Sequence, residues 1–151
     1  MRVTAKVDYA VRALVELAAA EGATVKGDRI AEAQGIPLKF LENILAELRR
    51  AGIVGSQRGA DGGYRIARDP DAVTVADVVR AVEGPLADVH GTPPEDLDPP
   101  GVAAPVREVW VATRAALRSV LEVVTVGQIA RNQLPKPVIA LLDEPSAWSR
   151  R

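Results

Sequence analysis

The sequence contains no cysteine, and this absence excludes several classes of functional site. Disulfides, thiolate nucleophiles, cysteine-type zinc sites and cysteine-ligated iron–sulfur clusters all need sulfur atoms that the chain does not have. Histidine is nearly absent too, because His90 is the single one and no group of metal-ligating residues surrounds it in the sequence. We interpret His90 as a solvated loop residue and expect no metal or other cofactor.

Aromatic residues make up only 3% of the chain, whereas apolar residues make up 48%, so the core must be built from Val, Leu, Ile and Ala. No apolar run approaches the ~20 residues needed to cross a bilayer. The N-terminus also lacks the apolar segment of a signal peptide. With 151 residues, we expect one globular domain with an appendage, placed in the cytoplasm and without a membrane partner.

The net charge of −1 hides an uneven distribution along the chain. Residues 1–68 carry eleven Lys and Arg against eight Asp and Glu, whereas residues 69–151 carry eight against twelve. The first half therefore has a net charge of +3 and the second half of −4. This distribution permits phosphate contacts on the basic half, although +3 also fits an ordinary surface.

Helical periodicity predicts a first helix that Thr4 caps and that stops at Gly22. A short helix over 28–34 ends at Gly35, and a third helix over 38–50 follows it. The buried face of that third helix consists of Leu41, Ile44, Leu45 and Leu48. A short helix, a glycine-bearing turn and a second helix form the helix-turn-helix pattern.

The stretch "RGADGGYRI", from Arg58 to Ile66, carries three glycines and fits a phosphate cradle, a tight hairpin or a loose loop. A phosphate-binding loop needs Gly-Lys-Ser/Thr and a following helix, but strand-like alternation follows here, so that hypothesis is excluded. Two short strands around a glycine-rich connection predict a β-hairpin. Thr74 then caps a fourth helix that Gly84 ends.

Residues 85–104 form a Pro-rich loop, and beyond it apolar residues step by four and three along a helix over 105–124. The members of this seam are Val106, Trp110, Thr113, Leu117, Val120 and Val124. The opposite face carries Arg107, Arg114, Arg118 and Glu122, which we expect to face water. Thr125 caps a last short helix, and residues 133–151 look like an extended tail.

The predicted fold is therefore mainly α with a small β-hairpin wing. We divide it into a winged helix-turn-helix domain at 1–84, the loop at 85–104, helices at 105–132 and the tail at 133–151. No cysteine, no strand-to-helix serine elbow and no paired carboxylates support catalysis, so we expect the protein not to be an enzyme.

A helix of this kind can read DNA through residues near its start, because it enters the major groove with that end. Lys39 can donate to guanine, Glu42 can accept from cytosine, and Asn43 can pair with adenine. Arg49 and Arg50 lie later on the helix, where they would meet phosphates. For any single one of these residues a solvated helix face is an equally compatible interpretation.

The hairpin directly after this helix has the position of a wing. Its Arg58 can reach phosphate or the narrow minor groove, where negative potential is concentrated. The glycines of the turn, Gly59, Gly62 and Gly63, permit positive φ and a close approach of the backbone to DNA. Tyr64 is expected to pack against the base of the hairpin.

The motifs "MRVTAKVDYAVRALVELA", "IAEAQGIPLKFLENILAELRRAGIV", "RGADGGYRIARDP" and "VTVADVVRAVEGPL" together resemble the Rrf2 family of bacterial winged-helix regulators. The long helix and the later "TVGQI" are similar to the family as well, and only the tail after about residue 132 lies outside the resemblance. Four motifs in order over this length make the resemblance specific.

The resemblance implies a homodimer that binds a partly palindromic operator in double-stranded DNA, as a repressor, and pairs through the helix over 105–124. It places base-reading positions on Leu38, Lys39, Glu42 and Asn43, and the wing on Arg58 to Tyr64. The phosphate-contacting N-terminal segment of the family corresponds here to Arg2, Thr4, Lys6 and Tyr9.

Many members of the family hold an iron–sulfur cluster through three cysteines in the loop before the dimerisation helix, and this chain has none. Asp8 stands where some members supply a carboxylate ligand, but one carboxylate and His90 cannot replace three thiolates. We therefore expect a cluster-free regulator that responds to a protein or small-molecule effector. The alternative hypothesis is an interaction module that docks to a partner, such as a metabolic enzyme, through its acidic second half.

Overall fold

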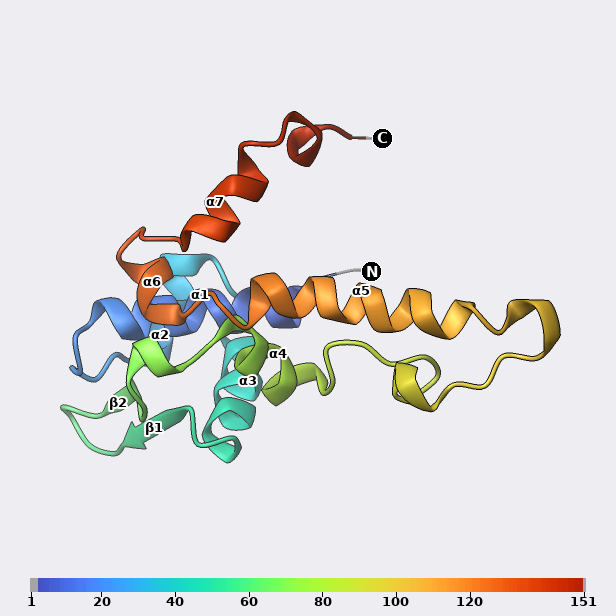
Figure 1. Cartoon of the computed structure of the whole chain (residues 1–151). Coiled ribbons are helices and arrows are strands. Elements are labelled where there is room, and N and C mark those ends of the chain that lie inside the picture. The colour runs from blue at the N-terminus through green and yellow to red at the C-terminus, as the bar shows by residue number, and fades with distance from the viewer. Residues whose placement is uncertain (1–2, 151) are drawn as a thin grey trace.

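The computed structural model describes residues 3–150, which are mainly helical with one two-stranded hairpin (Figure 1). The first part of the chain folds in the order predicted from the sequence: three helices, a hairpin and a fourth helix. These elements are α1 (Ala5–Ala19), α2 (Gly27–Gln34), α3 (Leu38–Arg50), β1 (Val54–Gln57), β2 (Gly63–Ile66) and α4 (Val75–Glu83). We call residues 3–84 the winged domain. The predicted fold class is confirmed.

Local sequence signals set the ends of the first helices. The hydroxyl of Thr4 accepts a hydrogen bond from the Val7 N–H and caps α1 as predicted. The helix α2 ends at Gly35, whose left-handed backbone, with φ of 62°, suits glycine because it has no Cβ. Pro37 precedes α3 and cannot extend α2, so the chain turns between the two helices.

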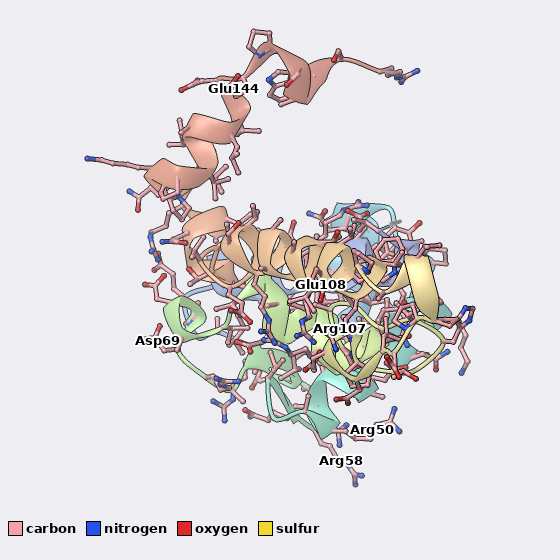
Figure 2. The ribbon with its side chains drawn as sticks, turned by 45° about the vertical axis from the view of Figure 1, so that its right-hand side comes forward. Arg50, Arg58, Asp69, Arg107, Glu108 and Glu144 are labelled. Carbon is pink, nitrogen blue, oxygen red and sulfur yellow. The ribbon has the colours of Figure 1, made fainter. Side chains whose placement is uncertain are left out.

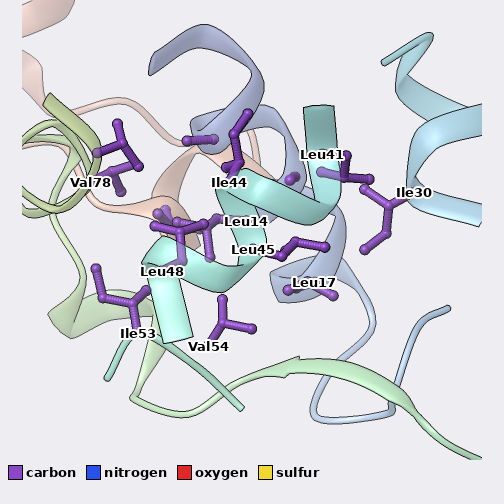
Figure 3. Close-up of a cluster of buried hydrophobic side chains, with 14 of the residues drawn as sticks. Leu14, Leu17, Ile30, Leu41, Ile44, Leu45, Leu48, Ile53, Val54 and Val78 are labelled. Atoms are coloured by element: carbon purple, nitrogen blue, oxygen red, sulfur yellow. The ribbon is translucent and has the colours of Figure 1, made fainter. Parts of the chain in front are cut away.

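The core of the winged domain is aliphatic, as the composition requires. Leucines of α3 interlock with Leu14 and Leu17 of α1, and Ile30 of α2 and Val78 of α4 close the cluster from the sides (Figure 3). All four predicted buried residues of α3 are fully buried: Leu41, Ile44, Leu45 and Leu48. This packing fixes which face of α3 remains available to solvent.

The wing is an antiparallel hairpin in which Val54 pairs with Ile66 at the base and Gln57 pairs with Gly63 near the tip. Val54 is buried, whereas Gln57 and residues 58–61 of the turn are exposed. The hairpin therefore has one end in the core and one end in solvent.

A second attachment of the wing was not predicted from the sequence. Tyr64 of β2 exchanges two backbone hydrogen bonds with Val25, each of 2.8 Å, and so adds a bridge from the linker between α1 and α2. The Thr24 hydroxyl also donates to the Asp61 carbonyl oxygen at 2.9 Å. The Tyr64 ring is half-buried against the core, which confirms its predicted packing.

The chain returns to the winged domain after its long helix. Thr74 and Thr125 form a backbone bridge, and each caps the helix that follows it with a complete capping box. The second of these helices is α6 (Val126–Ala130), which packs on α1. Both predicted caps are confirmed.

Residues 85–104 and the long helix α5 (Val106–Leu121) extend together to one side of the winged domain (Figure 1). We call residues 85–121 the arm. None of the residues of α5 is buried. The helix is shorter than predicted, and the last member of the predicted seam, Val124, lies beyond it with only 6% of its surface exposed. Val124 belongs to the core edge of its own chain, so its assignment to a dimer seam was wrong.

The prediction of an extended tail was also wrong. The tail contains the helix α7 (Lys136–Leu142) and a 3-10 turn, η4 (Pro145–Trp148), which project from the α6 end of the molecule (Figure 1). Prolines dominated the prediction, but Pro135 precedes α7 and Pro137 lies in its first turn, where the missing N–H is not needed. Within residues 3–150, no helix has the length and apolar character needed to cross a membrane.

Candidate DNA-binding surface

The outward face of α3 carries the side chains that the sequence analysis assigned to base reading. Leu38, Lys39, Glu42 and Asn43 are all exposed, because the leucine and isoleucine face of the same helix is fixed in the core. The Lys39 side chain is 90% exposed, and its ammonium lies 3.8 Å from the Glu42 carboxylate. Such a loose exposed pair contributes little to stability and leaves both groups available to a partner.

Three arginines extend this face beyond the start of α3. Arg49 and Arg50 end the helix, and Arg58 follows β1 in the turn of the wing. All three are exposed, and within residues 3–150 none of them has an ion pair or a side-chain hydrogen bond. Figure 2 shows Arg50 and Arg58 projecting from the same side of the molecule. These charges are therefore uncompensated on the side where α3 and the wing are exposed.

The three wing glycines have different surroundings. Gly59 and Gly63 have positive φ as predicted, but only Gly59 leaves room for a close approach of the backbone to DNA. A Cβ on Gly62 would lie 2.4 Å from the Gln57 carbonyl oxygen, and one on Gly63 would lie 2.6 Å from that of Val25. These two glycines let the hairpin close and dock on its own chain, and Gly62 is buried. Gly59 alone has open space around it, with φ of 104°.

The N-terminal residues Thr4 and Lys6 make more contacts within the fold than the sequence predicted. Arg2 lies outside the described residues. The Thr4 hydroxyl donates to Glu83 at 2.8 Å, and the Lys6 ammonium lies 2.8 Å from Glu47 and donates to the Val82 carbonyl at 2.6 Å. Lys6 therefore holds α1 to α3 and α4, and its assignment as a phosphate contact is not supported.

Tyr9 contacts an aromatic residue that the sequence analysis did not select. Its ring meets the Phe40 ring edge to face with centroids 5.7 Å apart, and the Arg12 guanidinium lies 5.5 Å from the Tyr9 centroid. Phe40 is exposed on α3 between Leu38 and Leu41. The signal that could have identified Phe40 in the sequence is an aromatic residue that lies outside the buried spacing of α3.

The face of α5 that is covered by the rest of the chain is not the face that was predicted. The predicted seam is largely open: Val106, Trp110 and Thr113 are exposed, and Leu117 and Val120 are half-buried. Trp110 lines a hollow of about 600 Å³ beneath residues 83–90. On the face expected to be wet, Arg114 is only 16% exposed, because the 3-10 turn η2 (Pro94–Asp96) lies over it.

Hydrogen bonds and ion pairs on the second half of the chain shift the pKa values of Glu95, Glu108 and Arg131. The hydrogen bond from Arg114, at 2.5 Å, lowers the pKa of the Glu95 carboxyl. A backbone hydrogen bond and then Arg107 lower the pKa of Glu108. Asp71 accepts a hydrogen bond from Arg131 at 2.7 Å and raises its pKa. None of these groups belongs to the face of α3 and the wing.

The residues present do not fit an iron–sulfur cluster. The loop at 85–104 offers no sulfur ligand, and residues 3–150 contain no group of three His, Cys, Asp or Glu side chains that could hold a metal ion. Asp8, at the place of a carboxylate ligand in some family members, pairs instead with Arg12 at 3.1 Å. We therefore derive no chemistry from such a cluster.

Comparison with known proteins gives the same assignment along almost the whole chain. The model of the Rrf2 family, described as an iron-dependent transcriptional regulator, matches residues 3–132. A putative HTH-type transcriptional regulator of Mycobacterium tuberculosis is 47% identical over 145 residues, which cover 95% of this chain and 90% of the relative.

Two solved structures extend the comparison to three dimensions. CymR, the global cysteine regulator of Bacillus subtilis, has a TM-score of 0.73 at 34% identity, covering 87% of this chain and 98% of CymR. IscR of T. potens has a TM-score of 0.67 at 31% identity, covering 100% of this chain and 93% of IscR. These relatives are DNA-binding regulators and not enzymes. The chain is thus a cysteine-free member of the Rrf2 family of DNA-binding transcriptional regulators.

Proposed function

We propose that the protein is a homodimeric, sequence-specific repressor that reads a partly palindromic operator. Residues at the start of α3 enter the major groove, and the turn of the wing enters the adjacent minor groove. The observation that carries this proposal is that Arg49, Arg50 and Arg58 are exposed and have no ion pair within residues 3–150, and that Arg50 and Arg58 project from the same side of the molecule (Figure 2). An operator offers the phosphates that these charges lack.

The contacts divide into two kinds. Lys39, Glu42 and Asn43 have the donors and acceptors that distinguish base pairs in the major groove, whereas Arg49 and Arg50 suit phosphates. Arg58 suits the minor groove, since Gly59 beside it leaves room for a close approach. Leu38 can contact a thymine methyl group.

The dimer rests on α5. A helix of sixteen residues with no buried side chain and an apolar seam is incomplete in a single chain. Pairing two copies through Val106, Trp110, Thr113, Leu117 and Val120 would bury that seam. Two recognition helices would then meet half-sites separated by one or more turns of DNA. The repressor role follows from the family resemblance.

We propose that the signal is something other than an iron–sulfur cluster, because the ligands for the cluster are missing. A small molecule or a partner protein acting on the arm would change the distance between the two recognition helices. The other hypothesis, a docking module without DNA binding, is disfavoured by the family assignment.

The test is DNA binding by a Lys39→Ala/Arg58→Ala variant. Operator fragments are first selected from genomic DNA by the purified wild-type protein, and affinity is then measured by fluorescence anisotropy over a range of salt. We expect at least a tenfold loss of affinity and a shallower salt dependence, because two cations that neutralise DNA charge and release counterions are lost.

The matched control is Lys136→Ala/Arg150→Ala, which removes the same charges from the tail. Unchanged affinity of the Lys39→Ala/Arg58→Ala variant, or an equal loss in the control, would show that the assigned contacts are wrong. The single variants sharpen the assignment: Lys39→Ala should relax sequence preference, whereas Arg58→Ala should weaken binding to all fragments alike.

A further inference from the structure

A cleft of about 320 Å³ lies where the winged domain meets the arm. Its walls are the end of α4, the loop that follows and the middle of α5. Three arginines line it, Arg80 from α4 and Arg114 and Arg118 from α5, together with apolar residues of the loop. Three guanidinium groups from two helices thus meet at one cavity, which the carboxylates of Asp88 and Glu95 also line.

The three arginines have unequal partners. Arg80 and Arg118 both pair with Glu122, and Arg80 also lies 3.8 Å from Asp77. Arg114 is the most covered of the three, yet within residues 3–150 its only polar side-chain partner is Glu95. A guanidinium has five N–H donors in a planar fork, so the hydrogen bond to Glu95 leaves further donors of Arg114 available to a ligand.

Glu95 reaches this site from the loop, and a ligand could displace its carboxylate from Arg114. It lies in η2, and its side chain is 53% exposed although it pairs with a covered arginine. The lowered pKa of its carboxyl, caused first by the hydrogen bond from Arg114, keeps it ionised. The Glu95 carboxylate thus stands where an anionic ligand would bind Arg114.

We propose that this cleft is the effector site of the protein and binds a small organic anion, whose carboxylate or phosphate group replaces Glu95 as the partner of Arg114. This assignment rests on the proposed regulatory function. Pro85, Leu86 and Pro93 supply an apolar wall for the rest of the molecule. The volume suits a metabolite-sized ligand and is too small for a macromolecule.

Displacement of Glu95 would release η2 from α5. The contact between η2 and α5 is the main attachment of the loop to that helix, and the loop joins α5 to α4. Lys6 and Thr4 hold this same end of α4, at Val82 and Glu83, to α1. An anion in the cleft would therefore change the angle between the arm and the DNA-binding face.

The site is tested by isothermal titration calorimetry of the full chain with citrate and with inorganic phosphate, in a chloride buffer of constant ionic strength. Arg114→Gln should weaken binding at least tenfold, because it removes a charge-assisted hydrogen-bond donor. Glu95→Gln should tighten binding several-fold, because it removes the resident competitor. Arg107→Gln, an exposed arginine on the same helix, is the control and should leave binding unchanged.

Opposite effects of Arg114→Gln and Glu95→Gln are the distinguishing result. Absence of saturable binding of both probes to the Glu95→Gln variant would overturn the proposal, and so would an equal loss in Arg107→Gln. Circular dichroism verifies that each variant is folded. Because the titration contains no DNA, anion binding without operator binding would refute the proposed function and leave the cleft assignment standing.

Discussion

The winged domain and the arm have a similar apolar composition but opposite states of burial. In the winged domain, Leu14, Leu41, Ile44 and Leu45 are completely buried around one another. In α5, Val106, Val109 and Trp110 remain exposed, and no residue of the helix is buried. Apolar side chains thus stabilise the winged domain because they are buried there, whereas those of α5 remain exposed to solvent.

This difference shows which region buries its apolar side chains within a single chain. The winged domain buries its large apolar side chains in a core that Val126 of α6 completes, and only Val3, Leu38 and Phe40 among its large apolar residues remain exposed. Within residues 3–150 the apolar seam of α5 is only partly covered, because Val106, Trp110 and Thr113 remain exposed. The arm is therefore where we expect association and regulation to act, whereas we expect the winged domain to bind DNA without rearranging.

The largest effect is expected from the core of the winged domain. Leu45→Ala should lower the free energy of unfolding by about 2–5 kcal/mol, because it removes buried methyl groups and leaves a cavity. Urea unfolding followed by circular dichroism measures this change. A loss below about 1 kcal/mol would contradict the described core, and Ala46→Ser on the exposed face of α3 is the control.

The next effect concerns the arm. Val106→Asp/Trp110→Asp should weaken the proposed dimer at least about 30-fold while leaving the unfolding of the winged domain unchanged, since apolar anchors at an interface are worth about 2 kcal/mol or more. Sedimentation equilibrium measures the association. Val102→Asp is the matched control, because Val102 is fully exposed outside α5. A variant that dimerises like the wild type would place the interface elsewhere.

A third prediction separates two glycines of the wing. Gly62→Ala should cost about 1–3 kcal/mol, because its Cβ would overlap the backbone of residues 57–59. Gly55→Ala is the control, since its Cβ would make ordinary contacts at 3.8 Å or more. Thermal unfolding and DNA binding are measured together. If both variants behave alike, the described turn is incorrect.

The smallest effect is the pH dependence of the loop. The folded-state pKa of Glu95 is lowered, so its ion pair with Arg114 stabilises the arm above the unfolded pKa of about 4.3. That contribution is lost as the pH falls through the lowered folded value. The chemical shift of the Arg114 guanidinium should therefore change below pH 4 in the wild type, and Glu95→Gln should abolish this transition. A transition at Arg114 that survives in Glu95→Gln would assign it to another group.

Much of the fold could be predicted from the sequence because its signals are local. Thr4, Thr74 and Thr125 cap helices by bonding to backbone a few residues away, and Gly35 ends α2 through its own φ. The spacing of Leu41, Ile44, Leu45 and Leu48 settled which face of α3 is exposed. The candidate DNA-reading positions followed from that spacing and from the family resemblance.

The failures arose where a distant segment decides the outcome. Lys6 pairs with Glu47 and Val82, and Gly63 meets Val25, which are contacts that no spacing reveals. The tail was judged by its prolines, although a proline in the first turn of a helix is compatible with α7.

By itself, the sequence determined the order of the elements, the buried face of α3 and the absence of any thiolate chemistry, because these depend on short-range spacing and on composition. Only the tertiary structure decided that η2 covers Arg114 and leaves the apolar seam of α5 open. The path of the loop decides which face of α5 is covered. A loop rich in proline and glycine has no periodicity from which that path could be predicted.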